Sequence, residues 1–105
     1  MNAKELHELD LAITKAKEYA YKAIENETDW GCCNFDHPIV KVGRTMQKDI
    51  DAMANDTYKD YRCKSLLHIM TEPVGQANRN TKFAEAMGKY LEELGYTTYV
   101  HYQMD

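Results

Sequence analysis

The stretch that decides the fold runs from Arg62 to Asp105, RCKSLLHIMTEPVGQANRNTKFAEAMGKYLEELGYTTYVHYQMD. It opens on Arg62–Met70, whose apolar residues are typical of a buried strand. After a polar loop, apolar residues at helical spacing predict an amphipathic helix from about Thr81 to Leu94, which ends before Gly95. Residues 96–102 then alternate between apolar and polar side chains, which predicts a second strand.

The first half of the chain also contains helical and strand patterns, without an internal repeat. Leucine, isoleucine and alanine recur at three- and four-residue steps over residues 3–26, which predicts one long helix. A short strand over residues 39–42 and a second helix from Thr45 to about Thr57 follow. We therefore expect one domain, residues 1–105, of the α/β (or α+β) class in the order α-β-α-β-α-β. Its small three-stranded sheet should have parallel pairing and carry three helices.

Composition narrows the functional classes. The chain of 105 residues fits a single domain, and its net charge of -4 argues against non-specific nucleic-acid binding. Residues 36–70 are nevertheless slightly basic between acidic flanks, which leaves room for a local anion pocket. The polar N-terminal residues and the lack of a long apolar run predict a cytoplasmic protein without a membrane span.

The junction between the predicted strand and the third helix is the first candidate site. Backbone N–H groups at the start of a helix attract anions, and polar side chains gather at this junction. The predicted ligand-binding residues are Gly75, Gln76, Asn78, Arg79, Asn80, Thr81 and Lys82. The alternative is a connecting loop in which an Asn or Thr caps the helix. The P-loop pattern is absent, and the glycine pattern of an acetyl-CoA cradle is incomplete.

The segment 27–38, ETDWGCCNFDHP, is the second candidate. It is rich in turn formers, yet it contains the only tryptophan of the chain, so we expect an ordered loop. An exposed aromatic side chain on such a loop is a common anchor for a protein partner. We predict partner contacts by Trp30 and Phe35, together with Tyr99 of the last strand. The alternative is that Trp30, one cysteine and Phe35 fill the core, while Asn34 and Asp36 form hydrogen bonds with the local backbone.

Tyrosines also concentrate near the predicted strands. Tyrosine combines a flat apolar ring with a polar tip and suits a binding surface, although it is also simply a good strand residue. The five tyrosines concerned are Tyr58, Tyr61, Tyr96, Tyr99 and Tyr102.

A metal site is a weaker interpretation of the same loop. Cys32, Cys33, Asp36 and His37 are ligand types for zinc, but their spacing differs from that of structural zinc sites. Cys63 would have to complete the set. An odd number of cysteines in a chain without an export signal favours free thiols. We therefore expect neither a metal nor a cofactor.

No catalytic signature is present in the sequence. Cys33 or Cys63 could pair with His37, His68 or His101, but nothing in the sequence places a thiol beside an imidazole. A histidine on an apolar strand is more often a core residue with satisfied hydrogen bonds. We predict no catalytic residues, and the alternative is a small enzyme that acts on a phosphorylated or acyl substrate at the Gly75–Lys82 junction.

Three blocks of sequence resemble small uncharacterised proteins of phages and mobile elements of Gram-positive bacteria. The blocks are Trp30-Gly31-x-Cys33-Asn34-Phe35-Asp36, Gly75-Gln76-x-Asn78-Arg79-x-Thr81 and Tyr102-Gln103-Met104-Asp105. The resemblance implies a context in which compact acidic proteins inhibit host factors or sequester nucleotide signals. The resulting hypothesis is a small non-enzymatic binding protein of the anti-defence type. Its partner would be a host protein or a small anionic ligand such as a nucleotide, and it could form a homodimer.

Overall fold

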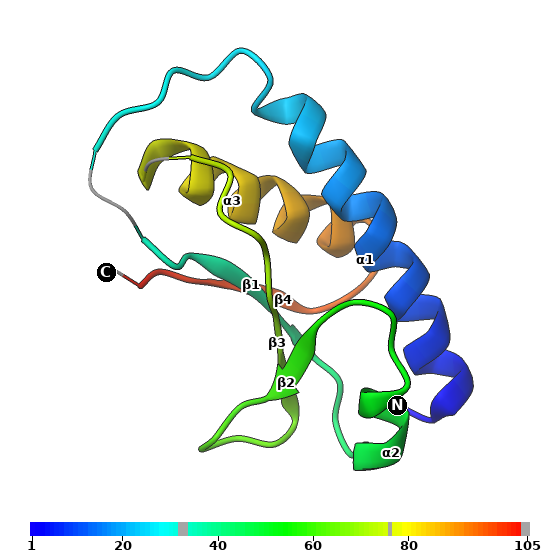
Figure 1. Ribbon diagram of the computed structural model, residues 1–105. Coiled ribbons are helices and arrows are strands. Elements are labelled where there is room, and N and C mark those ends of the chain that lie inside the picture. The colour runs from blue at the N-terminus through cyan, green and yellow to red at the C-terminus, as the bar shows by residue number, and fades with distance from the viewer. Residues whose placement is uncertain (32–33, 76, 104–105) are drawn as a thin grey trace.

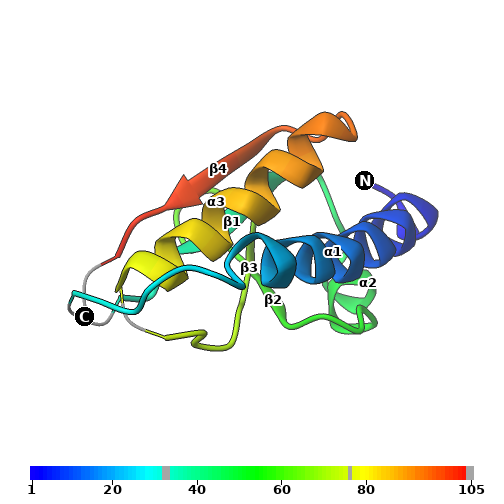
Figure 2. The same ribbon diagram turned by 90° about the horizontal axis from the view of Figure 1, so that it is seen from above.

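The computed structural model describes residues 1–31, 34–75 and 77–103, and its two long helices pack on one face of an antiparallel sheet (Figure 1). The elements in chain order are α1 (Ala3–Ala23), β1 (His37–Lys41), α2 (Gln47–Asp51), β2 (Thr57–Lys59), β3 (Leu66–Ile69), α3 (Ala77–Glu93) and β4 (Thr98–His101). Seen from above, α3 lies over β1 and β4, and α1 runs beside it (Figure 2). None of the described helices is long and apolar enough to cross a membrane.

Helix α1 begins where its sequence provides a capping box. The Asn2 side chain accepts a hydrogen bond from the Glu5 backbone N–H at 2.8 Å, and the Glu5 carboxylate accepts one from Asn2 N–H at 3.0 Å. The helix buries one stripe of apolar side chains against α3 and the sheet. Those residues, each at most 1% exposed, are Leu6, Leu9, Ile13, Ala16 and Ala20.

The sheet has the strand order β2-β3-β1-β4, and every pairing is antiparallel. From β1 to β4 the chain therefore has the order and connectivity of the split β-α-β arrangement. Helix α2, which joins β1 to β2, has only five residues. The N-terminal helix α1 covers the core that a longer connecting helix would cover, and its apolar stripe joins Leu67 and Ile69 of β3 in one cluster.

The sequence-based fold is wrong in the number of strands, in their pairing and in the end of the second helix, which is Asp51 instead of about Thr57. The sheet has four strands instead of three, and its pairings are antiparallel instead of parallel. The extra strand, β2, begins at Thr57, where the second helix was expected to end. The helix stops early because a buried carboxylate from α1 organises the turn that follows it. Asp10 accepts hydrogen bonds from the backbone N–H groups of Ala54 at 2.7 Å and Asn55 at 3.0 Å.

This carboxylate is charged although it is buried. Burial by itself would raise the pKa of Asp10, but hydrogen bonds from Ala54 and from both the side chain and backbone of Asn55 outweigh that effect and lower it. An ionised carboxylate accepts hydrogen bonds more strongly than a neutral acid. Asp10 thus ties α1 to the turn before β2.

Helix α3 begins four residues before the predicted start, at Ala77, and this shift matters for the candidate site. Asn78, Arg79 and Asn80 belong to its first turn instead of to a loop. The alternation expected for the last strand is confirmed. Thr98 and Val100 face α3 at Gly88, whose Cα has no side chain to keep them away, whereas Tyr99 points outward and is 52% exposed.

Candidate functional site

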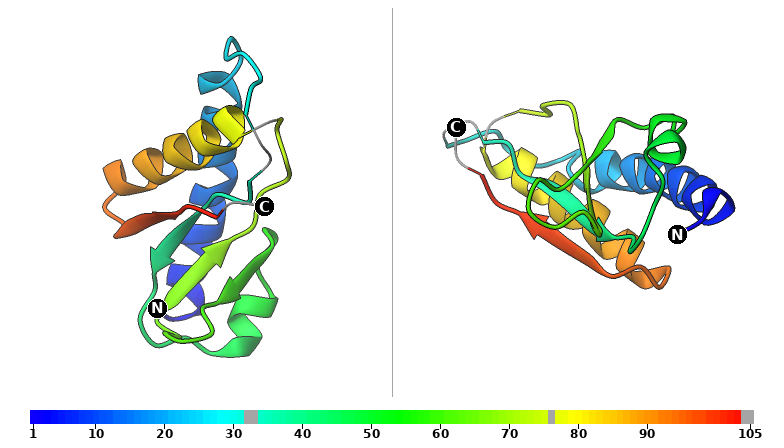
Figure 3. Two further views of the ribbon diagram at one scale, coloured as in Figure 1. Left: turned by 90° about the vertical axis from the view of Figure 1, so that its left-hand side faces the viewer. Right: turned by 90° about the horizontal axis from the view of Figure 1, so that it is seen from below.

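None of the described helices lies over the second face of the sheet, and we call this surface the open face. In the view from below, the strands lie in front of α3 (Figure 3). Alternate residues of a strand point to opposite faces, so the pairing registers place one set of side chains together on this side. The strand residues of the open face are His37, Ile39, Lys41, Tyr58, Leu66, His68, Tyr99 and His101.

Aromatic side chains, together with Lys41, form the exposed part of the open face. Tyr58 is 44% exposed and Tyr99 is 52% exposed. Phe35, which precedes β1 with the same alternation, is also 52% exposed. His37 and His68, on the two central strands, are almost fully buried among these larger neighbours. The open face therefore presents aromatic rings above a layer of buried imidazoles.

The imidazoles form a hydrogen-bonded chain, which we call the histidine chain. The carbonyl oxygen of Phe35 lies 2.8 Å from Nδ1 of His37, and Nε2 of His37 lies 2.7 Å from Nδ1 of His68. Nε2 of His68 lies 2.6 Å from Oδ1 of Asp60. The Tyr58 ring stacks on the His68 ring at a centroid distance of 4.5 Å, which packs a third strand, β2, onto the histidine chain.

Hydrogen-bonding rules fix the protons in this chain. A carbonyl oxygen only accepts, so Nδ1 of His37 carries a hydrogen, and an ionised Asp60 likewise requires a hydrogen on Nε2 of His68. The two remaining ring nitrogens, Nε2 of His37 and Nδ1 of His68, face each other.

The electrostatics act on the two ends of this chain in the same direction. Burial lowers the pKa of His37, and the neighbouring imidazoles of His68 and His101 lower it further. The hydrogen bond from His68, with backbone N–H bonds from Cys63 and Arg62, lowers the pKa of Asp60. Because both nitrogens of His37 and of His68 already have partners, neither ring offers a nitrogen to a substrate. The histidine chain therefore has a structural role, in which it fixes β1 and β3 relative to each other beneath the open face.

The predicted anion site has a different arrangement from the one expected. Arg79 donates from Nε to the carbonyl of Val74 at 2.8 Å and from Nη1 to the carbonyls of Ile24 at 3.0 Å and Glu27 at 2.7 Å. Gly75, with φ of 135°, lies against this guanidinium. Arg79 therefore joins the end of α1 to the loop before α3.

The side-chain amides of Asn78 and Asn80 form hydrogen bonds with the loop that connects α1 to β1. Asn78 accepts a hydrogen bond from Trp30 N–H at 2.8 Å and donates to the carbonyl of Thr28. Asn80 accepts from Val74 N–H at 2.9 Å and donates to the carbonyl of Asn34 at 3.2 Å. The side-chain amides of Asn78 and Asn80 therefore form their hydrogen bonds with the backbone of the protein itself.

The last two predicted ligand-binding residues, Thr81 and Lys82, bind acidic side chains of the protein itself. Thr81 donates to Oδ2 of Asp36 at 2.6 Å, and Lys82 forms an exposed ion pair with Glu27 at 2.9 Å. Gln76 lies outside the described residues. The junction thus serves as a connection between α1, its following loop and α3, and the sequence-based alternative of a structural loop has more support than an anion site.

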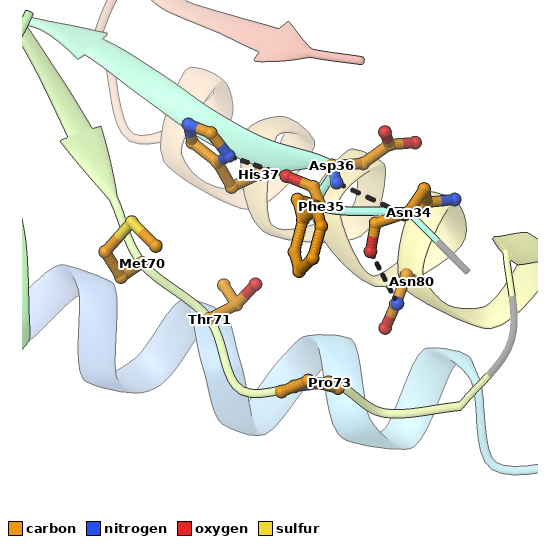
Figure 4. Close-up of a pocket in the computed structure, with 8 residues that line it drawn as sticks. All are labelled: Asn34, Phe35, Asp36, His37, Met70, Thr71, Pro73 and Asn80. Atoms are coloured by element: carbon orange, nitrogen blue, oxygen red, sulfur yellow. Dashed lines mark hydrogen bonds between the residues drawn. The ribbon is translucent and has the colours of Figure 1, made fainter. Parts of the chain in front are cut away.

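A small cavity lies between the junction and the open face (Figure 4). Its volume is about 30 Å³, which is room for a water molecule. Its lining residues are Asn34, Phe35, Asp36, His37, Met70, Thr71, Pro73 and Asn80. The cavity brings one candidate imidazole, His37, beside the junction, but it is too small for a phosphorylated substrate.

The predicted partner-binding residues are all accessible. Trp30 is 66% exposed, and Phe35 and Tyr99 are each 52% exposed, so none of them fills the core. Cys32 and Cys33 lie outside the described residues. Cys63 is an exposed free thiol whose Sγ lies 3.1 Å from the Ser65 hydroxyl.

Asp36, another candidate zinc ligand, accepts hydrogen bonds from Thr81 and from Gln103 N–H. The described His, Cys, Asp and Glu side chains do not assemble any group of three or more that could hold a metal ion. Comparison with protein-family models, curated proteins and solved structures finds no match to this chain.

Proposed function

We propose that this protein is a non-enzymatic binding protein that recognises a protein partner through the open face. The observation that supports this proposal is the grouping of Phe35, Tyr58 and Tyr99, each about half exposed, on a sheet face without a covering helix. Exposed aromatic side chains on a rigid surface are the usual anchors of protein interfaces. Across the strands, Ile39 and His68 lie between Tyr99 and Tyr58.

The chemistry of the face suits a protein more than a small polar ligand. Tyrosine and phenylalanine bury large apolar areas at low entropic cost, and Lys41 is the one lysine or arginine among the strand residues of the open face. The buried histidine chain fixes the central strands beneath the rings. A surface held in its bound shape loses little entropy on binding.

The resemblance to phage and mobile-element proteins suggests which kind of partner the protein binds. A host factor is the partner that this context favours, and inhibition of a defence function is the corresponding role. The alternatives at the Gly75–Lys82 junction have less support. Arg79 is committed to backbone carbonyls, and the adjacent cavity has the size of a water molecule.

Position-specific crosslinking tests the proposal. A photoreactive benzoyl-phenylalanine at position 99 should crosslink to one host protein in cells, whereas the same group at Leu11, which is 55% exposed on α1, should not. The double variant Phe35→Ser and Tyr99→Ser should lose that protein in a binding assay, and Leu11→Ser should retain it. Equal crosslinking from both positions, or a crosslink only to a second copy of this chain, would contradict the proposal.

A further inference from the structure

A hollow with only cationic charges lies at the end of the sheet where β1 leaves for α2. Its volume is about 400 Å³. It is lined by Gly43, Arg44, Thr45, Lys59, Lys64 and Ser65. Three of these residues are permanently cationic and none is acidic, although the whole chain has a net charge of -4. We call this feature the cationic hollow, and its local field attracts anions.

The cationic hollow is an organised structure. The backbone N–H of Gly43 donates to the carbonyl of Ser65 at 3.2 Å, which fixes the turn after β1 to the start of β3. Lys59 donates from Nζ to the carbonyl of Thr45 at 2.9 Å and is half-buried. This bond leaves other N–H groups of the ammonium available for a ligand.

Two observations indicate that the hollow lacks a partner. The charged groups of Arg44 and Lys64 form no ion pair or hydrogen bond with the described residues. The Thr45 hydroxyl oxygen is buried and has no hydrogen-bond partner within the described chain. A buried polar atom without a partner costs free energy, and a rotation about χ1 would let this hydroxyl bond a ligand oxygen.

The adjoining groove identifies the rest of the ligand. A larger hollow of about 1010 Å³ shares Lys59 and Lys64 with the cationic hollow and has Tyr58 and Tyr61 in its lining. Its other lining residues are Gln47, Asp51, Thr57 and Asp60, so the two carboxylates of the site lie in this groove and not in the cationic hollow. Tyr61 is 93% exposed, and Tyr58 packs on His68 while remaining 44% exposed. Aromatic side chains beside cations are the arrangement that binds a nucleobase and its phosphate.

We infer that the cationic hollow and its adjoining groove bind a nucleoside phosphate, with the phosphate against Arg44, Lys59 and Lys64 and the base against Tyr61. This site is separate from the Gly75–Lys82 junction, and the inference does not rest on the proposed protein partner. The same chemistry could belong to a free nucleotide or to the end of a single strand, and the titration below distinguishes these sources.

The test is an NMR titration of the amide signals with AMP, inorganic phosphate, adenosine and a short single-stranded RNA. AMP should shift the signals of residues 43–46 and 59–65, and phosphate alone should shift mainly those of 43–45. AMP should bind more tightly than either phosphate or adenosine alone. Tighter binding of the RNA than of AMP would identify a strand as the source of the ligand.

Variants assign the contacts. Lys64→Ala should weaken AMP binding about tenfold, the effect of losing one charge-assisted hydrogen bond, whereas Lys89→Ala on α3 should leave it unchanged. Tyr61→Ala should weaken AMP binding but leave phosphate binding unchanged. The double variant Phe35→Ser and Tyr99→Ser should retain AMP binding, which separates this site from the Phe35 and Tyr99 part of the open face; Tyr58 belongs to both surfaces.

Three results would overturn the inference. The first is the absence of shifts at residues 43–46 and 59–65 with millimolar AMP. The second is equal affinity for phosphate and AMP together with no effect of Tyr61→Ala. The third is an equal loss of AMP binding in Lys64→Ala and Lys89→Ala, which would indicate unspecific charge attraction.

Discussion

Replacing Arg79 by alanine separates a structural junction from an anion site. The substitution removes three hydrogen bonds from a charged donor, to the carbonyls of Val74, Ile24 and Glu27. Each such bond contributes about 1.5–3 kcal/mol when it is isolated. The three are not additive, because they share one side chain and the Ile24 carbonyl also accepts a hydrogen bond from Glu27 N–H.

We therefore expect Arg79→Ala to lower the free energy of unfolding by about 3 kcal/mol, and to lower Tm by about 10 °C or more. Urea unfolding followed by far-UV circular dichroism measures the first quantity, and calorimetry measures the second. Lys82→Ala is the matched control, because its ion pair with Glu27 is exposed and should contribute less than about 1 kcal/mol.

Arg79→Lys keeps the charge but loses the planar guanidinium that reaches several carbonyls at once, so most of the destabilisation should persist. The reasoning would be refuted if Arg79→Ala unfolded with the stability of the Lys82→Ala control. Loss of phosphate binding in that same stable variant would restore the junction as an anion site.

Two further predictions concern the loop and the histidine chain. Gly75→Ala should destabilise the protein by about 1–3 kcal/mol in urea unfolding, because φ is 135° and an added Cβ would lie 2.9 Å from Cδ of Arg79; unchanged stability would contradict this geometry. Stability should fall as the pH drops below about 6.5, because burial lowers the pKa of His37 and the unfolded chain then binds more protons than the folded one. The hydrogen bond from His68 lowers the pKa of Asp60, so a second fall should occur nearer pH 4, and Asp60→Asn should remove that acid limb from unfolding curves measured at several pH values.

The elements of the fold were predictable where the sequence pattern is local. The apolar stripe of α1 and the alternation around Tyr99 both depend on residues close in sequence, and the structure confirms the predicted helix and the predicted strand. Strand β2 was not predictable because it has three residues, and its start depends on Asp10, a side chain more than forty residues away. Antiparallel pairing likewise depends on which strands become neighbours, and periodicity does not contain that information.

The candidate site was likewise predictable only where it depends on residues that are close in sequence. The exposure of Trp30 and Phe35 follows from their place in a loop rich in turn formers. The role of Arg79 was misjudged because its three carbonyl partners lie in segments whose positions the sequence does not reveal. The histidine chain was missed for a related reason. His37 and His68 lie at outward positions of their strands, which is a weak signal, and only the pairing of β1 with β3 brings them together.

Helix α1 belongs to the core but not to the connectivity of the sheet, and this position has a consequence for how the molecule can be assembled. The split β-α-β arrangement from β1 to β4 is continuous without it, and the 24–36 loop is its covalent link to that arrangement. Its apolar stripe nevertheless covers Leu67 and Ile69. A chain cut within the loop should therefore yield two fragments that recover the native fold only when they are mixed, with an affinity set by the stripe from Leu6 to Ala20.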